Sequence, residues 1–152
     1  MDSIDLQILD ALQHEARITN VDLAKRVGLS PTPCLERVRR LERDGFIQGY
    51  RAELDAGRLG AGLLVFLEVS IDRTSPEAFA EFAAKIKAQR EVIECHMVAG
   101  GFDYLLKVRV RDMEAYRDFL GRTLVDVPHI RETRTYMVME QVKTGGAIPL
   151  AL

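Results

Sequence analysis

Arginine is the residue type whose spacing in this chain most clearly serves a chemical purpose. Arg37, Arg39, Arg40 and Arg43 occupy one short segment. A planar guanidinium group can bind a phosphate or the edge of a guanine through two parallel hydrogen bonds. Within residues 25–51, seven basic residues outnumber three acidic ones, which leaves a local charge of +4. The segment therefore suits a polyanion such as DNA, although a solvated, charged helix face has the same composition.

Two short helices joined by a tight turn are expected to position these arginines. Gly28 suits the left-handed conformation that ends a helix, and Ser30 followed by Pro31 is typical of a helix start. Gly45 then marks the end of the second helix. The pattern predicts a helix-turn-helix at about residues 20–43, in which the second helix enters the major groove of DNA.

The second helix has an apolar side and a basic side when it is projected at about 100° per residue. Its apolar side is predicted to face the core and to contain Leu35, Val38 and Leu41, flanked by Cys34. The arginines are predicted to lie on the opposite side, except Arg39, which falls at the border.

Arg37 and Arg40 are the leading candidates for contacts with bases or phosphates. Ser30 and Thr32 lie where a helix N-terminus can hold a phosphate, whereas Arg51, on a predicted wing, would reach only the DNA backbone. The full set of predicted DNA contacts is Ser30, Thr32, Pro33, Glu36, Arg37, Arg39, Arg40, Arg43 and Arg51.

The segments on either side of the two helices complete a DNA-binding domain. Residues 3–14 predict another helix, whose apolar residues Ile4, Ile8, Leu9 and Leu12 share one face. Residues 46–50 and 51–54 alternate like the two strands of a short β-hairpin. Together they predict a winged helix-turn-helix domain at residues 1–54.

The rest of the chain changes its periodicity. Residues 55–62 contain three glycines and are predicted to form a linker. Residues 63–143 then predict a β-α-β-β-α-β order, the ferredoxin-like arrangement of a four-stranded antiparallel sheet with both helices on one side. The other sheet face, with Leu64 and Phe66 on its first strand, is apolar enough to favour self-association. The fold class is α+β, and the tail at 144–152 has no predicted structure.

Composition excludes several classes of protein. An apolar content of 47%, a charged content of 29% and a net charge of −2 describe an ordinary globular protein rather than a histone-like one. No apolar run is long enough to span a bilayer, and no secretory signal opens the chain. Cys34 and Cys95 have no metal-binding partner at close spacing and are expected to be small buried hydrophobic residues in a reducing cytoplasm.

A small enzyme with a regulatory domain is the alternative from another class. Its site would have to use Cys34, Cys95, His14, His96 or His129. Cys95 and His96 are adjacent on a predicted strand, so their side chains point to opposite faces and form a poor nucleophile–base pair. No catalytic residue and no metal site is predicted.

The chain resembles the Lrp/AsnC family of "feast/famine" transcription regulators. Residues 29–42, LSPTPCLERVRRLE, followed by Gly45-Phe46-Ile47, resemble the winged helix of that family. Residues 100–106, GGFDYLL, resemble the loop and strand of its amino-acid-sensing domain, and residues 133–136 resemble its last strand. The resemblance covers essentially the whole chain and is closest to the leucine-responsive branch.

The resemblance implies a cytoplasmic, nucleoid-associated regulator of amino-acid metabolism genes that binds double-stranded DNA and no membrane. It implies a homodimer formed through strands that assembles further, commonly to an octamer. It implies no cofactor except an effector, leucine above all, held between sensing domains of neighbouring dimers. The positions it assigns to the ligand are Gly100, Gly101, Asp103, Tyr104, Met113, Val125, Tyr136 and Val138.

Two points of function stay open in the sequence. Many family members carry an acidic residue where this chain has Gly101, so the identity of the effector is in doubt. Backbone N–H groups of the Gly100-Gly101 turn could hold a carboxylate and Asp103 an ammonium, but the same residues also suit a plain tight hairpin with Asp103 as a turn residue. A nucleoid-architectural protein of low sequence specificity is a further alternative, distinguished by the ratio of specific to non-specific DNA affinity.

Overall fold

The structure, a computed structural model, describes residues 1–72 and 75–151, apart from the side chain of Leu124. It divides into two compact units, one formed by Met1–Glu53 with Val142–Leu152 and the other by Leu54–Gln141. The first unit is helical. The second contains the sheet.

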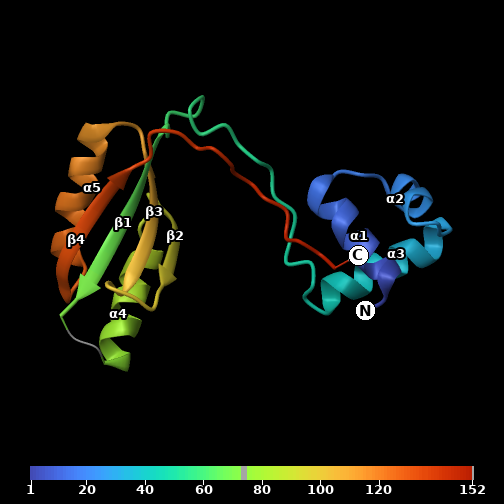
Figure 1. Cartoon of the computed structure of the whole chain (residues 1–152), viewed down its shortest axis with the longest axis horizontal. Coiled ribbons are helices and arrows are strands. Elements are labelled where there is room, and N and C mark those ends of the chain that lie inside the picture. Colours follow the sequence, from blue (N-terminus) through green and yellow to red (C-terminus); the bar gives the residue numbers. More distant parts are fainter. Residues whose placement is uncertain (73–74, 152) are drawn as a thin grey trace. The chain divides into compact units, whose positions relative to one another are not determined.

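The helical unit contains three helices around one small core (Figure 1). They are α1 (Ser3–His14), α2 (Asn20–Arg26) and α3 (Pro31–Arg43). Helix α1 begins with a capping box, in which the carboxylates of Asp2 and Asp5 each accept a hydrogen bond from the other's backbone N–H. The buried hydrophobic residues of this core are Ile8, Ala11, Leu23, Ala24, Val27, Cys34 and Leu41.

The turn between α2 and α3 holds the two helices at a fixed spacing. Gly28 adopts φ 71°, the left-handed conformation that costs glycine little. The N–H of Leu29 donates to the carbonyl of Ala24 at 2.9 Å. The side-chain amide of Asn20, at the start of α2, donates to the carbonyl of Pro31 at 2.8 Å. The predicted helix-turn-helix is therefore present, with both helices where the sequence indicates them.

The predicted hairpin after α3 is wrong for this chain. Residues 46–54, all of them described, contain no strand. The N–H groups of Phe46 and Ile47 instead both donate to the carbonyl of Leu41, which closes the end of α3. A two-residue hairpin turn requires positive φ at its centre and favours Asn-Gly. Tyr50-Arg51 does not supply that, and an isolated two-stranded hairpin is only marginally stable.

The second unit has the predicted β-α-β-β-α-β order, which confirms the ferredoxin-like domain and the α+β class. Every neighbouring pair in the sheet is antiparallel, in the order β2-β3-β1-β4. The elements are β1 (Leu63–Ile71), α4 (Pro76–Lys87), β2 (Val92–Met97), β3 (Tyr104–Val110), α5 (Met113–Asp126) and β4 (Ile130–Met137).

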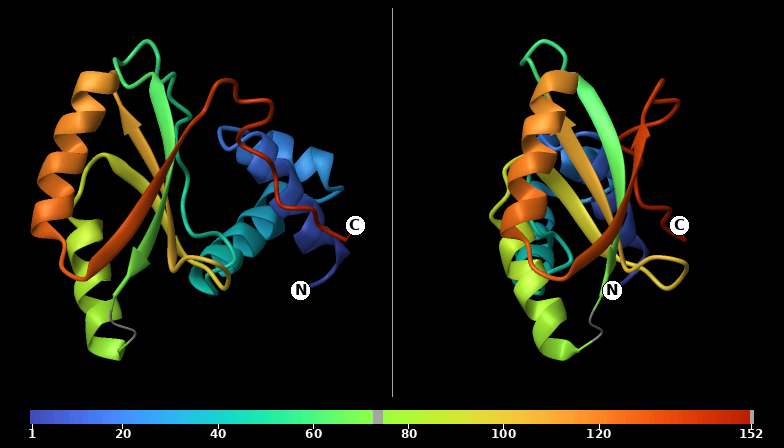
Figure 2. Two further views of the ribbon diagram at one scale, coloured as in Figure 1. Left: turned by 60° about the vertical axis from the view of Figure 1, so that its left-hand side comes forward. Right: turned by 90° about the vertical axis from the view of Figure 1, so that its left-hand side faces the viewer.

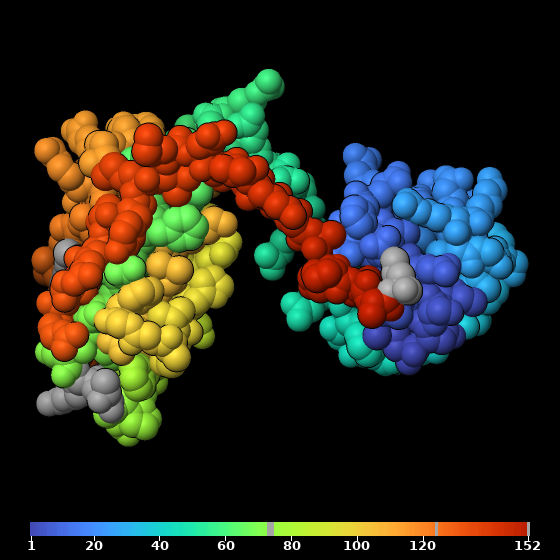
Figure 3. All heavy atoms as spheres, viewed as in Figure 1, coloured from blue at the N-terminus to red at the C-terminus, as the bar shows by residue number. Residues whose placement is uncertain are grey.

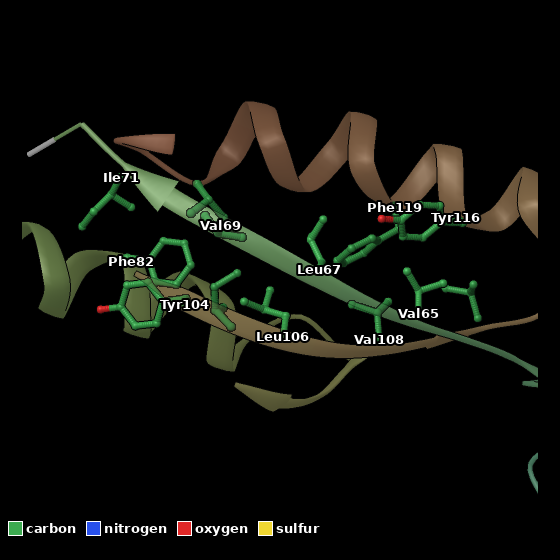
Figure 4. Packing of buried hydrophobic residues seen from close by; sticks show 13 residues of the cluster. Val65, Leu67, Val69, Ile71, Phe82, Tyr104, Leu106, Val108, Tyr116 and Phe119 are labelled. Carbon is green, nitrogen blue, oxygen red and sulfur yellow. The ribbon is translucent and has the colours of Figure 1, made fainter. Parts of the chain in front are cut away.

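One face of the sheet is covered by α4 and α5 (Figure 2). Alternate residues of β1 and β3 point toward these helices and pack with them, as the close-up in Figure 4 shows. The ring of Phe82 on α4 stacks on that of Tyr104 with centroids 4.2 Å apart. The hydroxyl of Tyr116 on α5 lies 2.7 Å from that of Thr135 on β4. The predicted core face is therefore the observed one.

Among the described residues of the second unit, no helix covers the other face of the sheet, where side chains of β4, β1 and β3 lie side by side (Figure 3). The strand register places Phe66 between Lys107 and Tyr136 on this open face. Phe66 is half-buried, and Tyr136 is 48% exposed. The face is thus part apolar and part charged, less apolar than the sequence suggested.

No described helix combines the length and the apolar character needed to cross a membrane.

Candidate nucleic-acid interface and ligand site

Two of the predicted DNA-contacting arginines are tied to α1 inside the helical unit. One terminal nitrogen of Arg37, Nη1, lies 2.7 Å from Oδ2 of Asp2 and 2.8 Å from Oδ1 of Asp5. Arg40 Nη2 lies 2.7 Å from both carboxylate oxygens of Asp5. Asp5 is 1% exposed, so these ion pairs are partly shielded from water. They join the start of α1 to the middle of α3.

The charges of this cluster stabilise one another. The backbone N–H of Asp5 and the guanidinium of Arg37 lower the pKa of Asp2 from its ordinary 3.8 to about 2. Burial alone would raise the pKa of Asp5, but the N–H of Asp2 and the two arginines outweigh it and lower that pKa. Hydrogen bonds to Asp2 and Asp5 raise the pKa of Arg37. All these groups therefore stay charged at neutral pH.

The ion pairs of Asp2 and Asp5 with Arg37 and Arg40 form a clamp between α1 and α3. This Asp2–Asp5 clamp corrects the predicted orientation of α3. Leu35, predicted to be in the core, is 37% exposed, whereas Cys34 and Leu41 are 0% and 1% exposed. Arg39, predicted at the border, is exposed. The physical reason is that Asp2 and Asp5 draw Arg37 and Arg40 toward α1, so the solvent-facing side of α3 is rotated away from both.

The outward face of α3 consists of Thr32, Leu35, Glu36, Arg39 and Arg43. Their spacing of three or four residues places them in one stripe along the helix. All five are exposed. The stripe offers a hydroxyl, an isobutyl group, a carboxylate and two guanidinium groups. These are the kinds of group that bind the acceptors, donors and thymine methyls exposed in a DNA major groove.

The remaining predicted DNA contacts lie at the edges of this stripe. Ser30 is exposed, and its hydroxyl makes no capping hydrogen bond to α3. Pro33 is half-buried and Arg51 is exposed. Arg40 is still 43% exposed in its side chain despite its bonds to Asp5.

Asp103 is an anchor of the loop between β2 and β3. Its carboxylate Oδ2 accepts a hydrogen bond from the N–H of Ile71 at 2.8 Å, beside the bulge in the pairing of β1 with β4. Its own N–H donates to the carbonyl of Val69 at 3.1 Å, and its carbonyl accepts from the N–H of Val98 at 2.9 Å. This geometry makes Asp103 an anchor between the loop and β1 rather than a turn residue bonded to its own backbone.

A small cavity of about 200 Å³ lies between this loop and the open face of the sheet. Two of the predicted ligand-binding residues, Gly101 and Tyr136, line this cavity. Two carboxylates and one guanidinium line it as well, and Arg134 Nε lies 3.1 Å from Oε1 of Glu132. These charges are complementary to a zwitterion. The lining residues are Glu68, Ser70, Gly101, Phe102, Glu132, Thr133, Arg134 and Tyr136.

The structure does not bring all the predicted ligand residues together within one chain. Tyr104 is 4% exposed and belongs to the core. Met113 begins α5, and Val138 bonds through its N–H to the carbonyl of Leu64, so both lie at the Leu63 end of β1. Val125 is 82% exposed near the end of α5, at the opposite, Ile71 end of the sheet where Gly100 also lies.

Sequence reasoning missed Glu68, Glu132 and Arg134 as cavity residues. The signal was present in the alternation of β1 and β4, which places these polar residues on the face opposite the core. Which of them meet the loop depends on the register of β4 on β1, with Glu68 opposite Arg134, and an isolated strand pattern does not give that register.

The cysteines give no support to an enzyme site. Cys34 is fully buried, and burial raises the pKa of its thiol, which makes it unreactive. Cys95 is exposed on β2, which corrects the expectation that it is buried.

A helix-turn-helix with an outward polar stripe, followed by a ferredoxin-like domain with a charged cavity, defines the class of ligand-responsive DNA-binding regulators. The chain belongs to the Lrp/AsnC family. Residues 1–48 match the family model "Winged helix-turn-helix DNA-binding", and residues 64–148 match "Lrp/AsnC ligand binding domain".

Curated relatives agree with this assignment. The chain is 59% identical over 148 residues to the Leucine-responsive regulatory protein of Salmonella typhimurium, covering 97% of this chain and 90% of that protein. It is 58% identical over the same length, with the same coverage, to the Leucine-responsive regulatory protein of Escherichia coli strain K12.

Solved structures share the fold along nearly the whole chain. A transcriptional regulator from Neisseria meningitidis in complex with L-Met is 36% identical with a TM-score of 0.93, covering 99% of this chain and 97% of that one. An AsnC-family regulator from Agrobacterium tumefaciens is also 36% identical with a TM-score of 0.93, covering 98% and 97%. The predictions of the family, of an amino-acid-responsive DNA-binding regulator and of a non-enzyme are confirmed by these relationships.

Proposed function

We propose that this chain is a cytoplasmic regulator of amino-acid metabolism genes whose DNA affinity or assembly changes when leucine or a similar amino acid binds. The outward stripe of α3 is the observation that carries the DNA-binding part. The names of the relatives support the effector, since two are leucine-responsive and a third was solved with L-Met.

In this proposal α3 lies in the major groove. Arg39 and Glu36 contact base edges, because both are exposed at the centre of the stripe. Arg43, Ser30 and Thr32 contact phosphates, while Pro33 shapes the leading end of the helix. Arg51 reaches the DNA backbone.

Arg37 and Arg40, which are bonded to Asp2 and Asp5, have different roles in this proposal. Arg37 is 25% exposed in its side chain and bonds to two carboxylates, so its main role is to orient α3. Arg40 keeps enough exposure to contact a phosphate while it holds Asp5.

The effector is assigned to the loop at residues 98–103 and the charged cavity beside it. Glu68 and Glu132 suit the ammonium group of an amino acid, and Arg134 suits its carboxylate. Because one chain does not gather Met113, Val125 and Val138 at this place, a neighbouring copy has to supply them. A homodimer formed through the open sheet face, assembling further to a form such as an octamer, provides such copies.

The test combines selection of a preferred duplex from random DNA with light scattering in the presence of each common amino acid. We expect specific affinity to exceed non-specific affinity by roughly 1,000-fold or more at fixed salt. We also expect leucine or a similar apolar amino acid to change the measured mass or the DNA affinity. Equal binding to all duplexes would instead favour the architectural alternative, and indifference to every amino acid would contradict the assigned effector.

A further inference from the structure

Leu35 is the one large apolar side chain on the outward stripe of α3. It is 37% exposed and takes no part in the core of the helical unit, which is built by Cys34 and Leu41 on the other side of the helix. Its stripe neighbours within one turn are polar: Thr32, Glu36 and Arg39. An isolated exposed leucine is ordinary on a protein surface. What distinguishes Leu35 is its position in the helix-turn-helix.

The position is the N-terminal half of the second helix of a helix-turn-helix. Residues in that half are the ones that contact base edges in the major groove. Two sets of contacts fix the orientation of α3. The side-chain amide of Asn20 donates to the carbonyl of Pro31, and the Asp2–Asp5 clamp binds Arg37 and Arg40. These contacts prevent α3 from rotating Leu35 back into the core.

Only one group in the major groove offers apolar surface to such a side chain. It is the C5 methyl of thymine, which stands out from the base edge, whereas cytosine presents only a hydrogen at the same position and the other readable groups are hydrogen-bond donors or acceptors. We infer that Leu35 reads a thymine methyl in each half-site, a specificity contact that rests on the proposed DNA-binding role of α3. Arg39 and Glu36, on the adjacent turn, then read the neighbouring polar edges.

The experiment replaces single thymines of the selected duplex with deoxyuridine, which removes only the methyl group. Binding is measured by fluorescence anisotropy for the wild type and for Leu35→Ala. In the wild type, at least one substitution per half-site should weaken binding about 4-fold, the effect of exposing one methyl-sized group. In Leu35→Ala the same substitution should have no effect.

Two variants separate this outcome from general damage. Leu35→Met keeps an apolar contact and should retain the methyl sensitivity, while thermal melts confirm that each variant folds. Arg39→Ala should weaken binding yet remain sensitive to the same methyl. The inference is overturned if no thymine methyl matters to the wild type, or if Leu35→Ala keeps the full sensitivity. Loss of specific binding by the wild type to every duplex would overturn the proposed function itself.

Discussion

At the scale of single residues, Asp5 decides which arginines of α3 face α1 rather than the outward stripe. It is 1% exposed and receives hydrogen bonds from both Arg37 and Arg40. A buried carboxylate without partners would be costly, and so would two arginines left without a counter-charge in this position. The contacts with Asp5 therefore orient α3 and also hold the side chains of Arg37 and Arg40 toward α1, away from the outward stripe.

Asp5→Asn should lower the free energy of unfolding of the helical unit by about 1–3 kcal/mol, because hydrogen bonds to a buried charged acceptor are lost. Urea denaturation followed by circular dichroism measures this change. Glu15→Gln, an exposed change in the same unit, is the matched control and should change stability little. An Asp5→Asn protein as stable as the control would show that the clamp contributes nothing.

The effect of the clamp should depend on pH in a defined direction. The pKa of Asp2 falls from 3.8 to about 2 on folding, and that of Asp5 also falls. Depressed carboxyl pKa values add stability above the unfolded value, and that stability is lost as the pH drops toward the folded value. The gap between wild type and Asp5→Asn should therefore be full at pH 7 and shrink as the pH falls below about 4. A gap independent of pH over this range would contradict an ionic origin.

Gly101 is a cavity residue at which the structure leaves room for a side chain. A Cβ atom added there meets nothing within 4 Å, and the residue borders the charged cavity. Gly101→Asp should therefore leave stability within about 0.5 kcal/mol of wild type. The added negative charge should raise the affinity for lysine relative to leucine roughly 5-fold, as expected of one partly exposed ion pair.

Isothermal titration with both amino acids measures that ratio. Gly100→Asp is the matched control, because Gly100 also has open space at Cβ but does not line the cavity. The effector assignment fails if both variants, or neither, change the ratio.

At the scale of elements, the sequence predicted the existence of the helices and strands better than their environment. Gly28, Ser30 and Pro31 act locally, so the ends of α2 and α3 followed from residue type alone. The orientation of α3 did not, because it depends on Asp2 and Asp5, more than thirty positions away along the chain. Among the cavity residues, Gly101 and Tyr136 were recognised by family resemblance, whereas Glu68 and Arg134 required the strand register.

The position of the C-terminal tail also depends on contacts with residues far away in the sequence, so the local sequence pattern did not predict it. It has no periodicity, yet Ile148 and Gln13 of α1 exchange two hydrogen bonds, with the amide nitrogen of Gln13 donating at 3.0 Å and its oxygen accepting at 2.9 Å. Beside this contact lies a cavity of about 470 Å³, lined in part by Leu9, Leu12 and Leu150. The tail is therefore part of the helical unit.

Gln13→Ala should release the tail, because both hydrogen bonds to Ile148 are lost, while α1 itself loses only the exposed hydrogen bond from Gln13 to Asp10. Hydrogen exchange of the peptide containing residues 144–150 should then become faster, with a loss of about 1 kcal/mol or less in local stability. Gln7→Ala, an exposed change on the same helix, should leave the exchange unchanged. Unaltered exchange in Gln13→Ala would mean that the tail is held by other contacts.

At the scale of the whole molecule, the open face of the sheet is the surface that the proposed dimer would cover. Leu64 is only 5% exposed, whereas Phe66 is half-buried and Tyr136 is about half exposed beside Lys107 and Arg134. A face that mixes apolar and charged groups is typical of an interface between copies rather than of a core. In the proposed function one α3 helix reads only half a site, so pairing of copies would also set the spacing of the two half-sites.

Phe66→Asp should break this pairing, because a dimer would bury one added carboxylate from each copy, and the neighbouring Lys107 is already paired with Glu94. Light scattering should then give the mass of a monomer at concentrations where the wild type is larger. Phe46→Asp makes the same change on the helical unit, at a side chain that is 54% exposed, and should keep the wild-type mass. Both proteins are first compared by thermal melting to show that they fold.

In Phe66→Asp, binding to a full operator should fall to the level of a single half-site and lose its response to leucine. If the mass, the operator affinity and the leucine response all remain those of the wild type, copies pair through another surface, and the ligand residues at the two ends of the sheet have to meet there instead.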